Sequence, residues 1–86
     1  MAHYASSKFW QAYARLPAQI RQLADKNFAL LKQNPQHPAL HFKKIKGKAY
    51  WSARVGSYRA VAVVDGGDYV WFWIGTHAEY DKIIQS

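Results

Sequence analysis

The stretch Ala49–Ile84 reads AYWSARVGSYRAVAVVDGGDYVWFWIGTHAEYDKII. Three of its runs are rich in aromatic and β-branched residues, as short β-strands are: 50–55, 58–64 and 69–74. Gly56-Ser57 separates the first two runs and Gly66-Gly67 the last two, and two glycines accept the positive φ angles of a two-residue hairpin loop. The stretch therefore predicts an antiparallel sheet of three strands.

A helix is predicted after the third strand, over residues 77–85. Thr76 is a good N-cap for it, because Glu79 at the third helical position completes a capping box. This arrangement predicts a polar corner where four side chains could meet: Arg54, Arg59, His77 and Tyr80.

A two-residue loop at Gly66-Gly67 also predicts the register of the last hairpin. The expected pairs are Val63 with Val70, Ala62 with Trp71, Val61 with Phe72, Ala60 with Trp73, and Arg59 with Ile74. Both faces of this hairpin are apolar, but helices can cover only one of them. Either Trp71 and Trp73 lie on an uncovered face that meets a partner, or they fill the core; both alternatives stay open.

The N-terminal half predicts mainly helix. Residues 3–5 are typical of a short edge strand, and Ser6 or Ser7 can cap a first helix. Leu16-Pro17 predicts a break, because the residue before proline disfavours helix and proline suits a first turn. A second helix is expected over 17–32, followed by an extended basic segment over 40–45.

The expected architecture is one α+β domain spanning residues 1–86. It consists of an N-terminal helical hairpin packed on a small, mainly antiparallel β-sheet of three to four strands, with a short C-terminal helix. No signal-peptide pattern and no long apolar run is visible, so we expect a cytoplasmic protein without membrane contact.

The formal net charge of +7 is concentrated in one part of the chain, because residues 26–64 contain no Asp or Glu. Such a one-sided block favours a polyanionic partner over a merely soluble surface. The candidate RNA-binding residues are His41, Lys43, Lys44, Lys46 and Lys48. The chain has no cysteine, and its four histidines show no metal-ligand spacing, so no metal or cofactor is expected.

The order of these motifs resembles the RelE/ParE superfamily of bacterial toxins, from type II toxin–antitoxin systems. The resemblance rests on Gly56-Ser57-Tyr58-Arg59, the strand, the acidic-glycine turn, the next strand, and Gly75-Thr76-His77. It extends upstream to Phe9 and therefore covers nearly the whole chain. Gly75-Thr76-His77 is similar to the segment of YafQ-type toxins.

The resemblance implies a ribosome-dependent mRNA endoribonuclease that represses translation, in which the ribose 2′-hydroxyl attacks the neighbouring phosphate. Arg59 would stabilise that phosphate, Arg54 would add a second positive charge, and His77 would exchange protons. The alternatives for Arg59 are an ion pair with Asp65, Glu79 or Asp81, or a stack on Trp73. Tyr80 would stack on a base or donate through its hydroxyl, the alternative being core packing.

The first of the three candidate strands departs from the pattern of the better-known nucleases, since it has neither lysine nor histidine. The second proton-transfer group is therefore unassigned. Two other functions fit the resemblance: a ParE-like inhibitor of DNA gyrase without chemistry, and a non-toxic relative that only binds antitoxin. All three imply a cognate acidic antitoxin that folds onto the basic domain.

Overall fold

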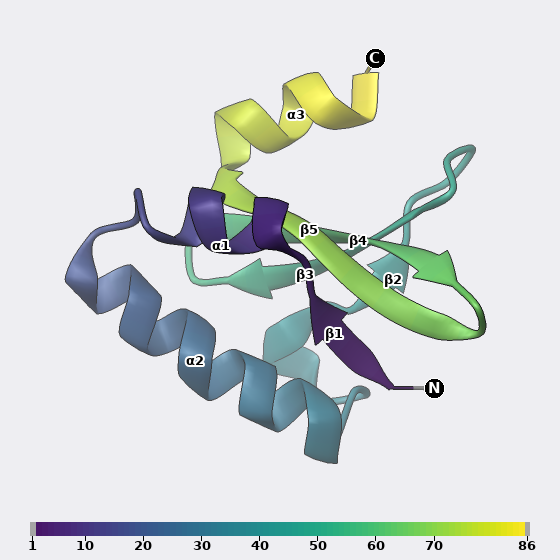
Figure 1. Ribbon diagram of the computed structural model, residues 1–86, viewed down its shortest axis with the longest axis horizontal. Helices are drawn as coiled ribbons and strands as arrows, with labels where there is room; N and C mark the ends of the chain where they lie inside the picture. Colours follow the sequence, from purple (N-terminus) through teal and green to yellow (C-terminus); the bar gives the residue numbers. More distant parts are fainter. Residues whose placement is uncertain (1, 86) are drawn as a thin grey trace.

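The protein forms a five-stranded mixed sheet with three α-helices around it, in a computed structural model that describes residues 2–85 (Figure 1). The elements are β1 (His3–Ala5), α1 (Ser7–Tyr13), α2 (Ala18–Gln33), the 3₁₀ turn η1 (Pro38–Leu40), β2 (Lys43–Lys44), β3 (Tyr50–Val55), β4 (Tyr58–Asp65), β5 (Asp68–Thr76) and α3 (His77–Gln85). The spatial order of the strands is β1-β5-β4-β3-β2. The predicted α+β class is confirmed, but the sheet has five strands instead of three to four.

β1 and β5, which are far apart in the sequence, are neighbours in the sheet. β1 lies parallel to β5, with His3 opposite Tyr69 and Ala5 opposite Trp71. The backbone N–H of Ser6 then donates to the Trp71 carbonyl at 2.9 Å, and the Ser6 hydroxyl accepts from the Phe9 N–H at 3.4 Å. The predicted edge strand and the Ser6 cap are therefore confirmed, and α1 begins where β1 stops covering the edge of β5.

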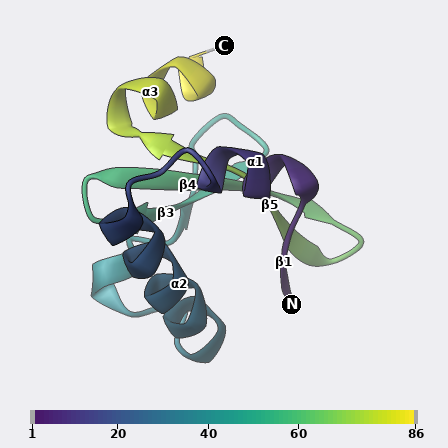
Figure 2. The same cartoon turned by 60° about the vertical axis from the view of Figure 1, so that its left-hand side comes forward.

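The two N-terminal helices cover different parts of the sheet. Leu16 and Pro17 separate them as predicted, and α2 begins one residue later than expected because Pro17, with ψ of 150°, is its N-cap. α1 packs along β5, whereas α2 crosses the opposite side of the molecule from α3 and packs on β3 (Figures 1 and 2). The helical hairpin thus packs on the sheet at two separate places.

The predicted extended segment 40–45 is mostly not a strand. Leu40 ends η1 and is only 1% exposed, and His41 takes a left-handed conformation with φ of 44°. Burying Leu40 in the core requires this turn, and the turn leaves only Lys43 and Lys44 in register with Ser52 and Trp51 of β3. The strand is therefore reduced to the two residues of β2.

The hairpin of β4 and β5 contains a β-bulge that the sequence did not predict. Gly66 and Gly67 form the loop with φ of 61° and 85°, and the expected pairs Val63–Val70 and Ala62–Trp71 are present. Beyond them the register shifts. The pairs predicted with Phe72, Trp73 and Ile74 are wrong, and the observed pairs are Val61–Trp73, Ala60–Ile74 and Arg59–Gly75. Phe72 is the extra residue, as bulges place two residues opposite one.

The bulge resolves which tryptophan enters the core. Trp71 and Ile74 are each 2% exposed and lie on the α2 side of the sheet, in the main core. Trp73 is opposite Val61 on the other side, which we call the α3 face and define by Ser52, Arg54, Arg59, Val61 and Trp73. The two tryptophans therefore do not share a face, and only Trp71 fills the core.

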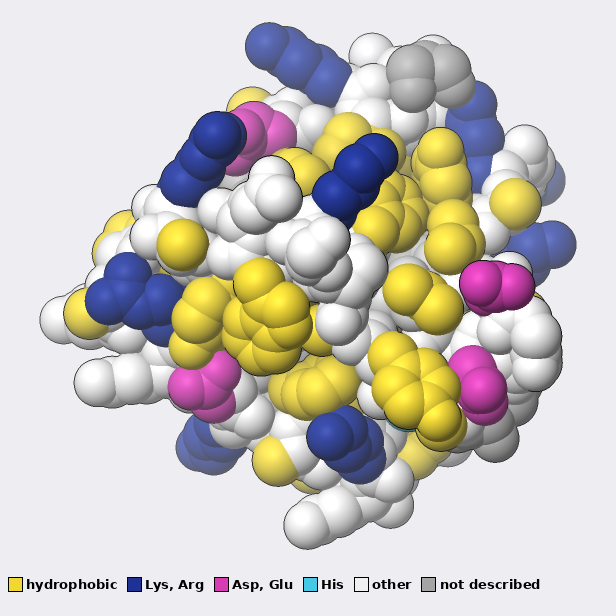
Figure 3. Space-filling model, in the orientation of Figure 1, with side chains coloured by type: hydrophobic (Ala, Val, Ile, Leu, Met, Phe, Trp, Pro, Cys, Tyr) yellow, Lys and Arg dark blue, Asp and Glu magenta, His cyan; other side chains and the backbone are white. Residues whose placement is uncertain are grey.

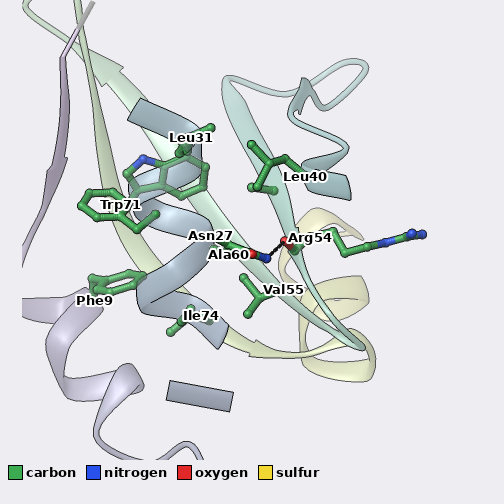
Figure 4. A pocket seen from close by; sticks show the side chains of 12 residues that line it. Phe9, Asn27, Leu31, Leu40, Arg54, Val55, Ala60, Trp71 and Ile74 are labelled. Atoms are coloured by element: carbon green, nitrogen blue, oxygen red, sulfur yellow. Dashed lines mark hydrogen bonds between the residues drawn. The ribbon is translucent and has the colours of Figure 1, made fainter. Parts of the chain in front are cut away.

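A small apolar pocket remains between α2 and the sheet (Figure 4). Phe9, Leu31, Leu40 and Trp71 contribute to its lining, and Asn27 closes one side by donating its amide to the Arg54 carbonyl at 3.1 Å. The Arg54 side chain points away from this pocket (Figure 4). The candidate site is therefore on the opposite face. None of the helices in the described residues 2–85 is long and apolar enough to cross a membrane.

Candidate functional site

The start of α3 is held by the predicted capping box, which is confirmed. The Thr76 hydroxyl accepts from the Glu79 N–H at 3.2 Å, and the Glu79 carboxylate accepts from the Thr76 N–H at 3.1 Å. The Thr76 hydroxyl lies 3.0 Å from the same carboxylate oxygen. These hydrogen bonds from Thr76, the backbone one first, lower the pKa of Glu79. The cap fixes His77 as the first residue of α3.

Gly75 lies in close contact with the ring of Trp73, which belongs to the same strand. A Cβ added at Gly75 would overlap the Trp73 ring and lie 2.9 Å from the Glu79 carboxylate. A side chain here would therefore displace either the ring or the cap. This contact is the physical reason for glycine immediately before Thr76 and His77.

Arg54 and Arg59 form a pair of like charges on the α3 face. They are directly opposite each other on β3 and β4, a position in which Cβ atoms are about 5 Å apart and like charges repel. Within residues 2–85, neither guanidinium forms an ion pair with a carboxylate. The alternative ion pairs of Arg59 with Asp65, Glu79 or Asp81 are absent from this part of the chain. The pair is thus a concentrated positive site without internal compensation.

The Tyr80 ring contacts the Arg59 guanidinium of this pair. The Arg59 guanidinium carbon lies 5.9 Å from the centroid of the Tyr80 ring, within the range of a cation–π contact. Tyr80 is 8% exposed, and its hydroxyl oxygen lies 3.4 Å from that of Ser52, which is itself 2% exposed. Because the hydroxyl points inward, the packing alternative accounts for Tyr80 better than proton donation does.

His77 lies at the solvent side of the same group. Its side chain is 56% exposed, its ring centroid is 5.8 Å from that of Tyr80, and its Nδ1 is 3.2 Å from an oxygen of Asp81. A carboxylate at Nδ1 favours the tautomer that keeps Nε2 as a proton acceptor. The structure therefore brings His77, Tyr80, Arg59 and Arg54 to one corner.

Two residues of this corner have contacts that were not predicted from the sequence, in which Asp81 was named only as an alternative ion-pair partner of Arg59. Asp81 lies four residues after His77, so helical spacing alone could have identified it. Ser52 meets Tyr80 only because of the pairing of β3 with β4 and the position of α3, so no local pattern indicates it.

The basic block lies beside the corner and is not part of it. Lys43 is opposite Ser52 and so belongs to the α3 face, whereas Lys44 is opposite Trp51. Lys46 and Lys48 are in the loop between β2 and β3, which rises on the same side of the sheet as α3 (Figures 1 and 2). His41 is exposed near the start of the block. No group of three metal-ligating side chains gathers within residues 2–85.

The family model of the ParE-like toxin domain matches residues 18–82. The chain therefore belongs to the ParE-like toxin domain family. A search of curated proteins gave no significant match.

Solved structures share the fold at low sequence identity. A chain of the RelB–RelE antitoxin–toxin complex from Methanococcus jannaschii aligns with a TM-score of 0.73 and 21% identity, over 93% of this chain and 96% of that one. A chain of the intact E. coli RelBE toxin–antitoxin complex aligns with a TM-score of 0.63 and 16% identity, over 87% of this chain and 94% of that one. A chain of the YoeB dimer from Staphylococcus aureus aligns with a TM-score of 0.65 and 15% identity, over 90% of this chain and 97% of that one.

Proposed function

We propose that this protein is the toxin of a type II toxin–antitoxin system and that it acts as a ribosome-dependent mRNA endoribonuclease. The observation that carries the proposal is the uncompensated pair of Arg54 and Arg59, which the Tyr80 ring connects to the exposed His77. Two adjacent guanidinium groups suit the phosphate of a transition state, because they bind its oxygens and stay charged. The Gly75-Thr76-His77 segment, similar to that of YafQ-type toxins, favours chemistry over binding alone.

In the proposed reaction, the ribose 2′-oxygen attacks the adjacent phosphorus while the bond from phosphorus to the 5′-oxygen breaks. Nε2 of His77 takes the proton of the 2′-hydroxyl, and Asp81 holds the imidazole in place through Nδ1. Arg59 and Arg54 neutralise the charge that develops on the phosphate. The leaving oxygen takes its proton from solvent, because β3 has no lysine or histidine and its Ser52 is buried. The products are a cyclic phosphate and a 5′-hydroxyl end.

The partners follow from charge. Lys43, Lys44, Lys46 and Lys48, with His41, would contact phosphates of the ribosome and its mRNA in the cytoplasm. An acidic antitoxin would neutralise the same surface, as is suggested by the toxin–antitoxin complexes among the structures that share this fold. The proposed reaction needs no metal or cofactor, because the substrate supplies the nucleophile and the protein supplies the cations.

The direct test is in-vitro translation with purified protein, followed by mapping of mRNA 5′ ends. We expect new ends within codons for wild type, none for His77→Ala, and a rate about 10²-fold or more lower for Arg59→Ala. Both variants should stay folded, since the cap of α3 is formed by Thr76 and Glu79. Arg15→Ala, an exposed arginine on the segment after α1, is the control and should cut normally.

Unchanged cutting by both variants would remove this site assignment. Growth inhibition without new mRNA ends would instead favour a DNA gyrase inhibitor, an alternative supported by the lack of lysine and histidine in β3 and by the ParE-like family. In that case, purified protein should inhibit gyrase supercoiling. Absence of both activities would leave a non-toxic domain that binds antitoxin.

A further inference from the structure

Three aromatic side chains form a strip on the α3 face, apart from the corner of His77 and Tyr80. Tyr50 and Phe72 have ring centroids 5.6 Å apart at an angle of 53°. Trp73 follows Phe72 and lies on the same face because the bulge interrupts the alternation of β5. All three are half-buried. We call Tyr50, Phe72 and Trp73 the aromatic strip.

The aromatic strip is not required to close the main core. That core lies on the other side of the sheet and has aromatic residues of its own, centred on Trp71 and Phe42. Beneath α3, Val61 is fully buried and Ser52 is 2% exposed, whereas the strip beside them keeps partial contact with solvent. Figure 3 shows hydrophobic side chains gathered between α3 and β5, with Lys or Arg and Asp or Glu side chains next to them.

Charged side chains of both signs border the strip, with the cations toward the arginine pair and the acidic residues toward the Gly66-Gly67 turn. Arg54 lies on the same strand face as Tyr50, four residues away, which is about 13 Å along a strand. Arg59 is opposite Arg54, and Lys43 is in the row of Ser52, Val61 and Trp73. The rows of Lys43 and of the arginine pair include no Asp or Glu, whereas Asp65 and Asp68 are paired on this face at the other end, one row beyond Val63 and Val70. A ligand that places a flat apolar group on the strip and an anionic group at the arginine end matches this combination.

We infer that the aromatic strip binds a base of single-stranded RNA while the arginine pair holds a nearby phosphate of the same strand. Proteins that bind single strands combine a cationic groove with aromatic rings on which bases stack. Tyr50 and Phe72 supply the rings here, and the Trp73 ring lies against Gly75, which is opposite Arg59 in the sheet. The inference rests on the proposed function, and it adds the part of the substrate that the corner does not contact.

The experiment measures binding of a short fluorescein-labelled oligoadenylate RNA by fluorescence anisotropy at several salt concentrations. We expect Tyr50→Ala and Phe72→Ala each to weaken binding between about 5-fold and about 100-fold, the range found for removal of one stacking ring. Tyr50→Phe and Phe72→Tyr keep a ring and should bind like wild type. Trp10→Ala is the matched control, because Trp10 is 49% exposed on α1 and makes its ring contacts with Phe9 and Tyr13.

The salt dependence separates stacking from charge. Loss of a stacking ring should leave the slope of log affinity against log salt unchanged, whereas Arg59→Ala should reduce that slope by about one phosphate contact. A changed slope in Tyr50→Ala, or wild-type affinity in both alanine variants, would overturn the inference and leave the proposed function intact.

Two other results would also overturn it. If wild type binds no RNA at any salt concentration, the inference fails, whereas the nuclease proposal is decided by the translation assay. If both alanine variants bind RNA normally but no longer co-purify with an acidic antitoxin, the strip is a protein interface.

Discussion

At the scale of single residues, His3 is unusual because it ties the N-terminal strand to the centre of the core. Its Nδ1 accepts a hydrogen bond from the indole N–H of Trp71 at 3.1 Å, and its ring stacks on Tyr69 at 4.8 Å. Phe42 meets the same ring edge-on at 5.7 Å. Burial lowers the pKa of His3, and nearby positive charges including Lys32 lower it further. The folded protein therefore prefers the neutral histidine.

This preference makes the folding stability depend on pH. The pKa of His3 is lower in the folded than in the unfolded chain. The contribution of neutral His3 to the free energy of unfolding is therefore complete at pH values above the unfolded-state pKa, and it is lost as the pH falls through the folded-state pKa. Protonation would also turn Nδ1 into a donor and leave the buried indole N–H without its acceptor. We expect thermal unfolding to shift to lower temperature between about pH 8 and about pH 5.

The comparison variant is His3→Gln, which cannot titrate and should lose most of this pH dependence. His41→Asn should keep it, because His41 is exposed and asparagine tolerates the left-handed conformation at this position. Equal pH profiles for wild type and His3→Gln would contradict the assignment.

The residues of the corner could be predicted only where chain order indicates them. Arg59 and His77 follow recognisable turns, and Arg54 was placed by its strand, so all three could be named from the sequence. Ser52 could not, because its contact with Tyr80 depends on two strand registers and a helix position. Proximity that arises from tertiary packing leaves no local signal.

At the scale of elements, the cap of α3 is the feature on which the site depends most. Thr76→Ala removes the hydroxyl that accepts from the Glu79 N–H, and we expect a loss of about 1 kcal/mol in unfolding free energy. Faster hydrogen exchange of α3 amides, with unchanged exchange in β4, would check it. Thr76→Ser keeps a hydroxyl and should behave like wild type; equal protection in all three proteins would contradict the prediction.

Acid should weaken the same cap. Because the pKa of Glu79 is lowered in the folded protein, the ionised carboxylate contributes to folding stability at pH values above the ordinary carboxyl pKa. This contribution is lost as the pH falls through the folded-state pKa of Glu79.

The turn and the bulge of the β4–β5 hairpin show what a sequence can and cannot specify. Gly66 and Gly67 require positive φ angles, and this requirement made the loop and the first two strand pairs predictable. Nothing in Val70–Ile74 distinguishes Phe72 from its neighbours, so the bulge and the three pairs beyond it were missed. The same holds for η1, whose turn follows from burying Leu40.

At the scale of the whole molecule, charge predicts the partner. The formal net charge of +7 and the acid-free interval 26–64 favour an acidic binding segment. We expect the protein isolated from its native host at low salt to carry a small acidic protein, released by high salt and denaturant together. Mass spectrometry of the released fraction would identify it, with Lys43→Glu combined with Lys44→Glu expected to reduce recovery. Isolation of the protein alone under these conditions would contradict an antitoxin partner.

The pairing of β1 with β5 has a consequence for the synthesis of the protein. Residues 3–5 of β1 pair with residues 69–71 of β5, so most of the described sequence lies between these two strands. A nascent chain cannot complete the sheet until β5 has emerged, and closing so long a loop is slow. The fold, and with it the proposed action on ribosomes, would thus be complete only after residues 69–71 have left the ribosome that makes the chain.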